Sequence, residues 1–493
     1  MRDGRSSEPG ITQPAGTKRP HAFPPHPTSA SDLYCNPALT TMSQDGTPAT
    51  AGAGSPDPSQ DQRSYGASVG RWSGYVRELF SNPNGPLLGS VEPDKIEEAA
   101  REKLKDSPGA WGFLYGNAGT GETHRANRNA FARWQIVPRM LRDVTHRNVE
   151  TTLFGVTYPS PLLIAPIGAQ SCFHPDAELA TARAAGALNV PLVVSGASSR
   201  SLEAIADANG PNSGRWFQIY WPRSDVYTLS LLRRAKASGY SALVVTVDTM
   251  SIGWRPADLD RAFLPFVHGV GIQVGLSDPE FMKAQGKEPH AEEDAPQFPY
   301  DAAKIRVLYA QGDRLTRERV ELAAAWGKEV VNGTYRTWED VRFLRKNWEG
   351  PVVVKGLLAV QDIEIAIDEG IDGVIVSNHG GRQVDGSISS LVALERIMKS
   401  QKVKEAQASG KFTILFDSGI RTGSDIFRAL ALGAQGVLLG RPYAYGLVIA
   451  GQAGVEAAIK NVLADFELTL GLAGHKTVAD IQGKADEVLI RAE

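Results

Sequence analysis

Short apolar runs alternate with amphipathic segments along the chain from about residue 160 onward. Each run ends in glycine, proline or a polar residue, and a segment rich in alanine, leucine and charged residues usually follows it with helical spacing. Most runs are apolar throughout, which is typical of strands that are buried on both faces. The eight predicted strands are Pro161–Pro166, Val190–Gly196, Arg215–Trp221, Ala242–Asp248, Pro351–Gly356, Gly373–Ser377, Phe412–Gly419 and Gly436–Pro442. The predicted helices include Asp176–Leu188, Ser224–Ser238, Val360–Glu369, Ser424–Leu432 and Gly454–Leu470.

Eight strand–helix units predict an α/β fold, a (β/α)₈ TIM barrel over residues 159–473. A doubly wound sheet is the competing fold, but the number of units and the reactive residues at the strand ends favour the barrel. Most strands start about 22 to 39 residues after the one before, whereas 109 residues separate Ala242 from Pro351. A helix at Thr337–Lys346 is predicted to end this gap. Residues 250–335 are expected to form a lid over the C-terminal end of the barrel, with an oligomer contact or a disordered loop as the alternatives.

The segments outside the barrel differ in composition. Residues 71–158 contain helical stretches and are expected to form an N-terminal cap on the barrel, and residues 474–493 a C-terminal tail or helix. Residues 1–70 hold 10 of the 30 prolines but only five Leu, Ile, Val or Phe residues. Such a segment buries too little apolar surface to offset its ordering entropy, so we expect a disordered tail. The alternative is a transit peptide, suggested by Arg2, Arg5, Lys18 and Arg19.

Composition narrows the class of protein. The chain of 493 residues has 52 Lys and Arg against 55 Asp and Glu, a balance that argues against nucleic acid as a partner. Its two cysteines, Cys35 and Cys172, are too few for a disulfide framework or a Cys-rich zinc site, and no metal is expected. Apolar stretches are interrupted well short of the ~20 residues of a membrane span. We expect a cytoplasmic protein with no membrane contact, with a peroxisome or mitochondrion as the alternative compartment.

Candidate catalytic residues follow the sixth predicted strand, in the run Ser377–Gln383. Barrel enzymes place their reactive groups at the C-terminal ends of strands. His379 is a suitable general base near neutral pH, and Arg382 is suited to bind a carboxylate with two parallel hydrogen bonds. A base beside an anion-binding group fits proton abstraction from a hydroxy acid. The structural alternative is a histidine that only packs against an arginine ion pair.

Other strand ends add polar groups to the same face of the barrel. Asp248 after strand 4 is placed to hold an imidazole and stabilise its cation, or else to cap the insertion. Arg255 follows it as a second arginine. Gln218 and Tyr220 alternate with apolar neighbours on strand 3 and therefore share a face. Lys355 ends the otherwise apolar strand 5, where an unpaired charge would be costly, so it should meet an anion.

The last two strands predict a phosphate site. Asp417–Arg421 and Gly440–Arg441 place glycine and arginine on the two loops where barrels commonly bind phosphate. Arginine side chains and exposed backbone N–H groups supply the donors. The pairing of these two loops indicates a phosphorylated substrate or cofactor.

These motifs together carry a family resemblance. Ser377–Gln383 resembles the signature of FMN-dependent α-hydroxy acid oxidases and dehydrogenases, and the likeness runs from about Ser107 to Ala473. Within that family the chain is most similar to lactate 2-monooxygenase and L-lactate oxidase-like proteins, through Gly253–Pro256, Phe416–Gly423 and Arg441–Ala444. The resemblance implies FMN as cofactor and oxidation of a small 2-hydroxy acid with oxygen as acceptor. It also implies a homo-oligomer, a tetramer or octamer.

The resemblance further implies residue roles. His379 takes a proton from the substrate while Asp248 holds its imidazole, Arg382 and Arg255 bind the substrate carboxylate, and Tyr220 bonds its polar groups. The implied FMN contacts are Ile167, Gly168, Ser195, Gln218, Thr246, Lys355, Ser377, Asp417, Ser418, Gly419, Arg421, Gly440 and Arg441.

Two positions in the chain bear on substrate preference. The family has a substrate-contacting Tyr in the cap, and an ungapped match places Phe113 there, whereas a local shift would give that role to Tyr115. A missing hydroxyl would favour a larger or more apolar acid than lactate. Gly168 stands where several family members have Ala, and the missing methyl is expected to leave room for oxygen or product.

Three alternative functions differ from the leading one. The first is an FMN-dependent dehydrogenase that passes electrons to another acceptor. The second is a sugar-phosphate aldolase or isomerase, which the phosphate loops alone would permit. The third is an inactive binding protein, which the presence of His379, Arg382, Lys355 and Asp248 argues against.

Overall fold

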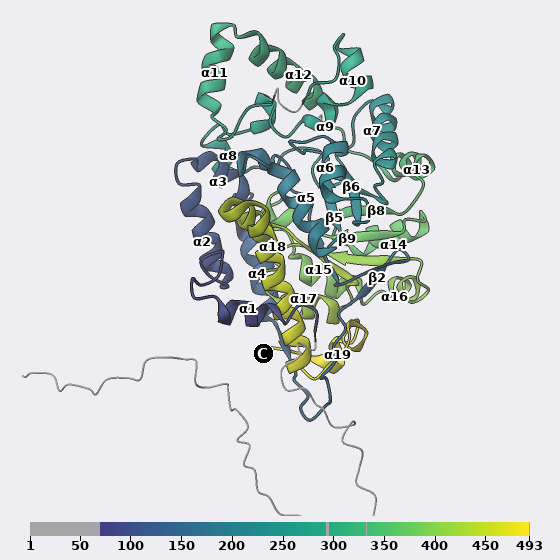
Figure 1. Cartoon of the computed structure of the whole chain (residues 1–493). Coiled ribbons are helices and arrows are strands. Elements are labelled where there is room, and N and C mark those ends of the chain that lie inside the picture. Colours follow the sequence, from purple (N-terminus) through teal and green to yellow (C-terminus); the bar gives the residue numbers. More distant parts are fainter. Residues whose placement is uncertain (1–69, 292–294, 332, 493) are drawn as a thin grey trace, which may run out of the picture. The chain divides into compact units, whose positions relative to one another are not determined.

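The computed structural model describes residues 70–291, 295–331 and 333–492, all within one compact unit. In this part of the chain eight parallel strands close into a barrel, which confirms the predicted (β/α)₈ fold (Figure 1). Seven of the eight strands lie within their predicted runs, and the fifth extends one residue beyond its run, to Leu357. In the order of the chain they are β4 (Leu162–Ile164), β5 (Leu192–Ser195), β6 (Arg215–Ile219), β7 (Ala242–Thr246), β8 (Val352–Leu357), β9 (Gly373–Val376), β10 (Thr413–Phe416) and β11 (Gly436–Leu439).

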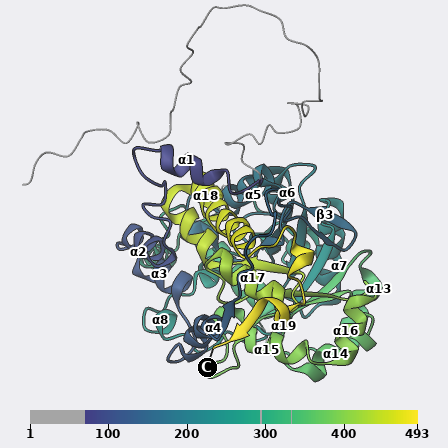
Figure 2. The ribbon, with the colours of Figure 1, turned by 90° about the horizontal axis from the view of Figure 1, so that it is seen from below.

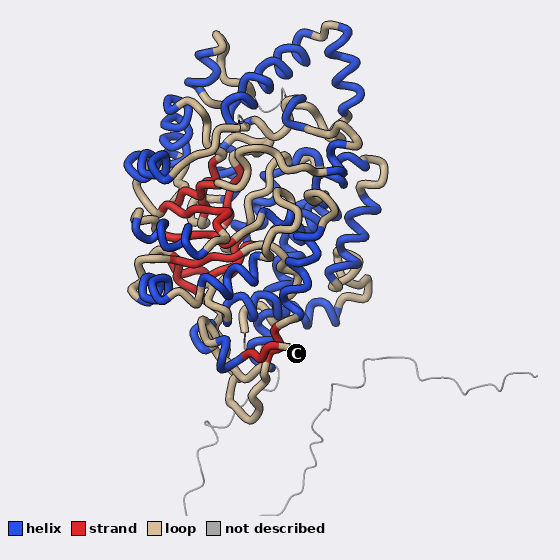
Figure 3. Tube along the Cα trace, turned by 180° about the vertical axis from the view of Figure 1, so that it is seen from behind, coloured by secondary structure: helices blue, strands red, loops and turns tan. Residues whose placement is uncertain are grey.

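The strands are apolar throughout because both of their faces are buried. One set of side chains points inward and fills the barrel, including Leu163, Val193, Val244, Ile375 and Leu438. The alternate set packs outward against the surrounding helices in a second, larger cluster. The red strands of Figure 3 form the centre of this arrangement, with blue helices around them.

Helices follow the strands as the periodicity predicts. The helices around the barrel are α5 (Ala177–Leu188), α6 (Leu202–Asn209), α7 (Asp225–Ala237), α13 (Trp338–Asn347), α14 (Val360–Asp368), α15 (Ser390–Ile397), α16 (Gln401–Ala408), α17 (Gly423–Ala431) and α18 (Arg441–Leu472). Before the barrel come α1 (Tyr75–Ser81), α2 (Pro93–Lys103), α3 (Pro108–Tyr115) and α4 (Glu122–Ala132). These four helices form the expected helical segment, which packs beside α18 in Figures 1 and 2.

Short strands close the N-terminal end of the barrel. The hairpin of β2 (Thr151–Leu153) and β3 (Val156–Tyr158) places Leu153 and Tyr158 in the same cluster as the inward-facing strand residues. The C-terminal segment contains α19 (Ala485–Val488) and β12 (Leu489–Arg491), and β12 pairs with β1 (Trp134–Ile136). The predicted tail at residues 1–70 lies outside the described residues, apart from Gly70.

The insertion after β7 is folded in its described residues. It contains α8 (Pro256–Leu259), α9 (Gln273–Leu276), α10 (Pro279–Ala284), α11 (Ala302–Gln311) and α12 (Arg314–Val330). Helices α10 to α12 lie at the top of Figure 1, above the labelled barrel strands β5, β6, β8 and β9. The described residues of the expected lid are therefore largely helical.

Helix α18 differs from the expectation that every apolar stretch is too short to span a membrane. Among the described residues it is the one helix that is long and apolar enough to cross a membrane by length and composition. However, 61% of its apolar window is buried inside the protein, where it packs against α5, α17 and α2. Its backbone is also non-helical at Ala450 and Gly451. We therefore interpret α18 as a buried core helix of the barrel.

Glu467 of α18 attaches the start of the cap to the barrel, which gives a stability prediction. Its buried Oε2 accepts hydrogen bonds from the N–H groups of Trp72 (2.9 Å) and Ser73 (2.6 Å). We expect Glu467→Leu to lower the melting temperature, because an unpaired buried donor costs about 1–3 kcal/mol. Glu467→Gln keeps an acceptor and should lower it less. Equal melting curves for the wild type and both variants would contradict this.

Candidate active site

His379 and Asp248 form a hydrogen-bonded pair at the C-terminal end of the barrel. The His379 Nδ1 atom lies 2.9 Å from Asp248 Oδ1, and the hydroxyl of Thr249 lies 3.2 Å from the same nitrogen. Thr249 also donates to Asp248 Oδ1 at 2.8 Å. Because Nδ1 is bound to the carboxylate, Nε2 is the nitrogen left for a ligand in the cavity.

The backbone at His379 is held in an uncommon conformation. Its φ of 57° lies in the left-handed region, which costs about 1–3 kcal/mol in a residue with a side chain. Hydrogen bonds fix the turn: Ser377 Oγ accepts from the N–H of His379 at 3.1 Å, and Ser418 Oγ accepts from that of Gly380 at 3.0 Å. Asn378 accepts from the N–H of Gly381 and is itself bonded to Asn127 of α4. The loop therefore positions the imidazole rigidly.

Lys355 supplies the charge that balances this pair. Its buried ammonium group lies 3.7 Å from a carboxylate oxygen of both Asp248 and Asp417 and donates to Ser377 Oγ at 3.0 Å. Burial alone would lower the pKa of Lys355, but the two carboxylates outweigh it and raise the pKa. The expected anionic partners of this lysine are therefore Asp248 and Asp417.

Protonation in the pair follows from the same surroundings. Burial lowers the pKa of His379; Asp248 acts against this shift and Lys355 adds to it. Burial alone would raise the pKa of Asp248, but Lys355 and His379 hold it well below its usual range. Near neutral pH the pair is therefore a neutral imidazole beside a carboxylate, which is the form that accepts a proton.

Arg382 and Arg255 bring two guanidinium groups to the same cavity. Arg382 donates to the Gly116 carbonyl at 2.6 Å and lies 5.6 Å above the Phe113 ring. Arg255 donates to the Arg382 carbonyl at 3.0 Å and to Gln383 Oε1 at 2.5 Å. Burial, followed by the charges of Arg255 and Arg441, lowers the pKa of Arg382. An anion placed between Arg382 and Arg255 would relieve this repulsion.

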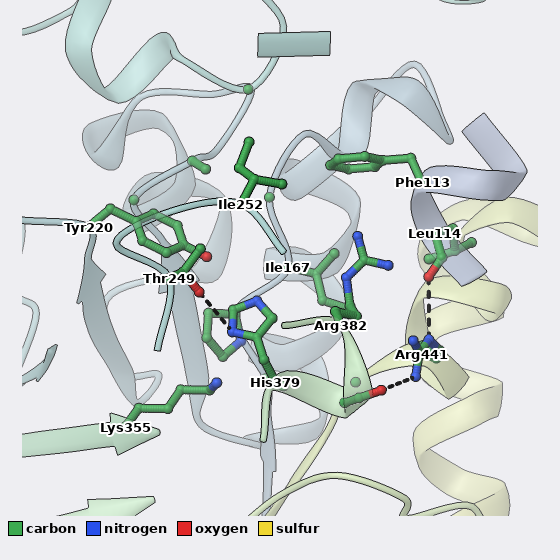
Figure 4. A pocket seen from close by; sticks show the side chains of 18 of the residues that line it. Phe113, Leu114, Ile167, Tyr220, Thr249, Ile252, Lys355, His379, Arg382 and Arg441 are labelled. Atoms are coloured by element: carbon green, nitrogen blue, oxygen red, sulfur yellow. Dashed lines mark hydrogen bonds between the residues drawn. The ribbon is translucent and has the colours of Figure 1, made fainter. Parts of the chain in front are cut away.

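The cavity has a polar floor and an apolar upper wall. Figure 4 shows the His379 ring and the Arg382 side chain facing the same space, with Tyr220 and Lys355 on one side and Arg441 on the other. Burial raises the pKa of Tyr220, so its hydroxyl remains a hydrogen-bond donor. The apolar wall comes from the cap and the insertion and consists of Phe113, Leu114, Ile252, Phe266, Ile272, Trp326, Val330 and Val331.

Arg421 and Arg441 form the second cationic region of the cavity. Arg441 opens α18, a helix of 32 residues, so its side chain and the helix N-terminus present donors together. It donates to Asn117 Oδ1 at 2.7 Å and to the Gly380 carbonyl at 3.1 Å. Nearby His124 is neutral because burial, then Arg441 and Arg421, lower its pKa to about 3. No carboxylate forms a salt bridge with either arginine in the described residues, as suits a site that binds an anion.

A family model described as FMN-dependent dehydrogenase matches residues 100–487. This match covers more than half of the chain. The protein belongs to the FMN-dependent dehydrogenase family. Its cofactor is FMN, and it is an oxidoreductase of the CH–OH group of 2-hydroxy acids.

Individual relatives are similar along most of their length. The FMN-dependent alpha-hydroxy acid dehydrogenase qulF of Penicillium citrinum is 42% identical over 391 residues, which cover 79% of this chain and 89% of the relative. The L-lactate oxidase of Lysinibacillus sphaericus is 38% identical over 387 residues, 78% of this chain and 90% of the relative. A mandelate oxidase structure matches 82% of this chain and 99% of its own, with a TM-score of 0.63 and 34% identity.

The polar groups of the barrel fit the flavin of this family. Gln218 Nε2 and Thr246 Oγ1 are buried at the ends of β6 and β7 and have no hydrogen-bond partner in the described part of the chain. Sheet register places Thr246 beside Lys355, and Gln218 beside Ser195. A flat ring with hydrogen-bonding edges would satisfy the two orphaned groups. Beyond them, a Cβ built on Gly440 would have only the Cβ of Ala165 within 4 Å, at 3.9 Å, so this glycine leaves room beside the arginines.

The structure brings most of the candidate residues together. The candidates that line the cavity are Ile167, Gly168, Tyr220, Arg255, Lys355, His379, Arg382, Asp417, Ser418, Gly419, Arg421, Gly440 and Arg441. Ser195, Gln218, Thr246 and Ser377 are buried at the strand ends beside it. Asp248 lies behind His379. Thr249 and the apolar lid residues were not predicted from the sequence, and Gln383 was given no role beyond its place in the run Ser377–Gln383. The apolar period of Arg314–Val330 was the available signal for the lid.

The two cap aromatics lie in different places. Phe113 lines the cavity, with its ring facing the Arg382 guanidinium. Tyr115 is not among the lining residues: its ring stacks on Trp111 with centroids 5.2 Å apart and meets the edge of His124. The tyrosine would therefore need a different local conformation to reach the substrate space, whereas Phe113 already occupies it.

The prediction about Gly168 is wrong for this structure. A Cβ built on Gly168 would lie 2.4 Å from the Ala197 carbonyl oxygen and 2.9 Å from the Ala197 Cβ. The same carbonyl oxygen accepts the N–H of Ala169 at 2.9 Å, which fixes it in place. The glycine therefore permits a close approach of two loops and leaves no extra room for oxygen or product.

Charge reversal at Arg441 tests its role in FMN binding. We expect Arg441→Glu to purify with much less flavin than the wild type, because it places a carboxylate where a dianionic phosphate needs donors. The bound FMN per protein is measured from the absorbance spectrum of the folded protein. Arg396→Glu, an exposed charge reversal on α15, is the matched control and should keep its flavin. Full flavin content in Arg441→Glu would show that the phosphate lies elsewhere.

Proposed function

We propose that this protein oxidises an L-2-hydroxy acid to the 2-oxo acid and uses oxygen as the electron acceptor. One observation carries the proposal: a neutral histidine paired with a carboxylate shares a cavity with two guanidinium groups. A 2-hydroxy acid needs both parts, because its carboxylate requires a cationic binding site while its Cα–OH group requires a base. A sugar-phosphate isomerase would leave the buried polar groups of Gln218 and Thr246, which fit a flavin ring, without a use.

Each side chain has one task in this reaction. Arg382 and Arg255 bind the substrate carboxylate, and the Tyr220 hydroxyl orients a substrate oxygen. The Nε2 atom of His379 takes a proton from the substrate, and Asp248 stabilises the imidazolium that results. When bound, FMN supplies the acceptor for the two electrons that the substrate loses.

The proposed FMN contacts extend across the barrel from β4 to β11. Ile167, Gly168, Ser195, Gln218, Thr246 and Ser377 would hold the ring system and ribityl chain. Lys355 would place its positive charge against the polar edge of the ring and stabilise negative charge there. Asp417, Ser418, Gly419, Arg421, Gly440 and Arg441 would hold the ribityl and phosphate end.

Relatives support the choice of oxygen as acceptor. Several similar proteins are named oxidases, among them the L-lactate oxidase of Lysinibacillus sphaericus and a 4-hydroxymandelate oxidase of Amycolatopsis orientalis. The second candidate is a dehydrogenase with another acceptor, which the name of the Penicillium citrinum relative favours. Oxygen consumption with substrate as the sole reductant separates the two. The cytoplasmic location and the homo-oligomer stay predictions.

Replacement of the base tests the mechanism. We expect His379→Gln to bind FMN normally but to reduce it with substrate about 10²–10⁴ times more slowly, the usual cost of losing a general base. Because burial lowers the pKa of His379, the wild-type kcat/KM should fall only as the pH drops through a value below the ordinary 6.5 of histidine. The measurement is anaerobic flavin reduction in a stopped-flow instrument. Near wild-type bleaching in the variant would contradict the role of the base.

The residue at position 113 tests substrate preference. We expect Phe113→Tyr to raise kcat/KM for glycolate and lactate relative to acids with apolar side chains, because it adds a donor to an apolar wall. Tyr115→Phe is the matched control and should leave the ratio unchanged, since that ring lies outside the cavity lining. Steady-state oxygen uptake over a series of L-2-hydroxy acids gives the ratio. A silent Phe113→Tyr with a damaging Tyr115→Phe would assign the family role to Tyr115.

A further inference from the structure

One face of lid helix α12 forms part of the cavity wall. Ala323, Trp326, Gly327 and Val330 are spaced three and four residues apart, so they lie on one side of the helix, and all four line the cavity that contains His379. Their neighbours in the wall are Ile272 and Phe266 from the same insertion. None of these lid residues carries a charge, and the indole N–H of Trp326 is the one side-chain hydrogen-bonding group among them. The lid therefore surrounds the uncharged end of a ligand.

Gly327 is unusual within this face. A glycine inside a helix is less favourable than alanine by about 1 kcal/mol, so it normally serves a close packing contact or a special backbone angle. Gly327 has neither: its backbone is not among those with positive φ, and a Cβ built on it meets no atom within 4 Å beyond its own helix backbone. Gly275, in the same lid, shows the opposite case, because its Cβ would lie 2.3 Å from the Trp326 ring. Gly327 therefore leaves open space on the cavity face of α12.

The wall around Gly327 is rigid. The Trp326 ring is buried against Phe281, with ring centroids 5.0 Å apart, and it fits into the room that Gly275 leaves. The Trp326 ring is therefore held in place and does not move into the space beside Gly327.

The lid is attached to the barrel on both sides of this face. The N–H of Gln273 donates to the Ser198 carbonyl at 3.1 Å, and buried Arg319 of α12 donates to Gln273 Oε1 at 3.1 Å. At the other end of α12, the backbone carbonyl of Glu329 accepts a hydrogen bond from the backbone N–H of Arg223 at 2.9 Å. The carboxylate of Glu329 accepts a hydrogen bond from the backbone N–H of Ser224, also at 2.9 Å. These bonds fix α12 to the loops that follow β5 and β6. The distance between the helix and the catalytic groups is thereby set.

We propose that Gly327 determines the size of the substrate: it keeps open a subsite under α12 that accepts the large apolar side chain of a 2-hydroxy acid. This inference rests on the proposed function, in which Arg382 and Arg255 hold the carboxylate. With the carboxylate at the arginines and the Cα–OH at His379, the side chain extends toward the apolar wall. An arylalkyl group suits a wall that contains Trp326 and Phe266.

Filling the subsite tests the proposal. We expect Gly327→Leu to lower kcat/KM for L-2-hydroxy-4-phenylbutyrate by at least about 10-fold and to leave kcat/KM for L-lactate within about twofold of the wild type, since hydrophobic sites discriminate on this scale for each added carbon. Gly327→Ala should lower kcat/KM for the larger substrate less than Gly327→Leu does. It should also raise the melting temperature, because alanine favours the helix. Ala324→Leu places a leucine on the exposed side of α12, adding one carbon less than Gly327→Leu, and should leave kcat/KM for both substrates unchanged.

A binding measurement gives an independent readout. Calorimetry with the FMN-loaded protein should show that Gly327→Leu weakens the binding of 2-oxo-4-phenylbutyrate, which has no hydroxyl to oxidise, and leaves that of pyruvate unchanged. Equal effects on both acids, or an effect of Ala324→Leu as large as that of Gly327→Leu, would overturn the subsite. If the wild type oxidises neither hydroxy acid, the proposed function fails. If it oxidises both and Gly327→Leu does not discriminate, only the subsite fails.

Discussion

A buried ammonium group between two carboxylates is the interaction on which the catalytic end of the barrel depends. Lys355 on β8 lies 3.7 Å from both Asp248, after β7, and Asp417, after β10. Either carboxylate without the lysine would be an uncompensated buried charge, and the same holds for the lysine without them. Because Asp248 is thereby kept ionised, His379 is held in one orientation as a neutral base. The charge balance of three strand ends thus sets the protonation state of a side chain on a fourth element.

The barrel supplies the charged groups apart from Arg255, which lies at the start of the insertion, whereas the cap and lid supply the apolar boundary of the cavity. The cap contributes backbone carbonyls to Arg382 and Arg441 and the ring of Phe113, which faces the Arg382 guanidinium. The lid contributes an apolar helix face that is fixed to two barrel loops. Water-poor surroundings strengthen each electrostatic contact at the floor. The charged floor and the apolar wall of the cavity therefore come largely from different parts of the chain.

The strands and the charged residues were predictable from the sequence because their signals are local. Apolar runs such as Val352–Leu357 indicate buried strands by composition alone, and a lysine at their end requires a partner. The partners of Lys355 were not predictable without knowing which strand ends adjoin. The lid was expected from the place of the insertion after the fourth strand, but which of its residues face the cavity depends on how α12 packs, so Trp326 and Gly327 were missed. Gly168 was misjudged because the carbonyl that fills its space belongs to another loop, that of Ala197.

The cationic side chains that line the cavity outnumber its carboxylates, so the cavity suits anionic ligands. Arg255 and Arg441 are buried and Arg382 is partly buried; burial followed by neighbouring charge lowers the pKa of Arg382, while burial is the main cause of the lowered pKa of Arg441. Phosphate at Arg441 and Arg421 would neutralise one region, and a substrate carboxylate at Arg382 and Arg255 the other. Each anion would stabilise the folded state in proportion to its affinity. The positive charge of Arg441 repels that of Arg382. A phosphate bound at Arg441 would reduce this repulsion, and its negative charge would also weaken the attraction of Arg382 for a substrate carboxylate.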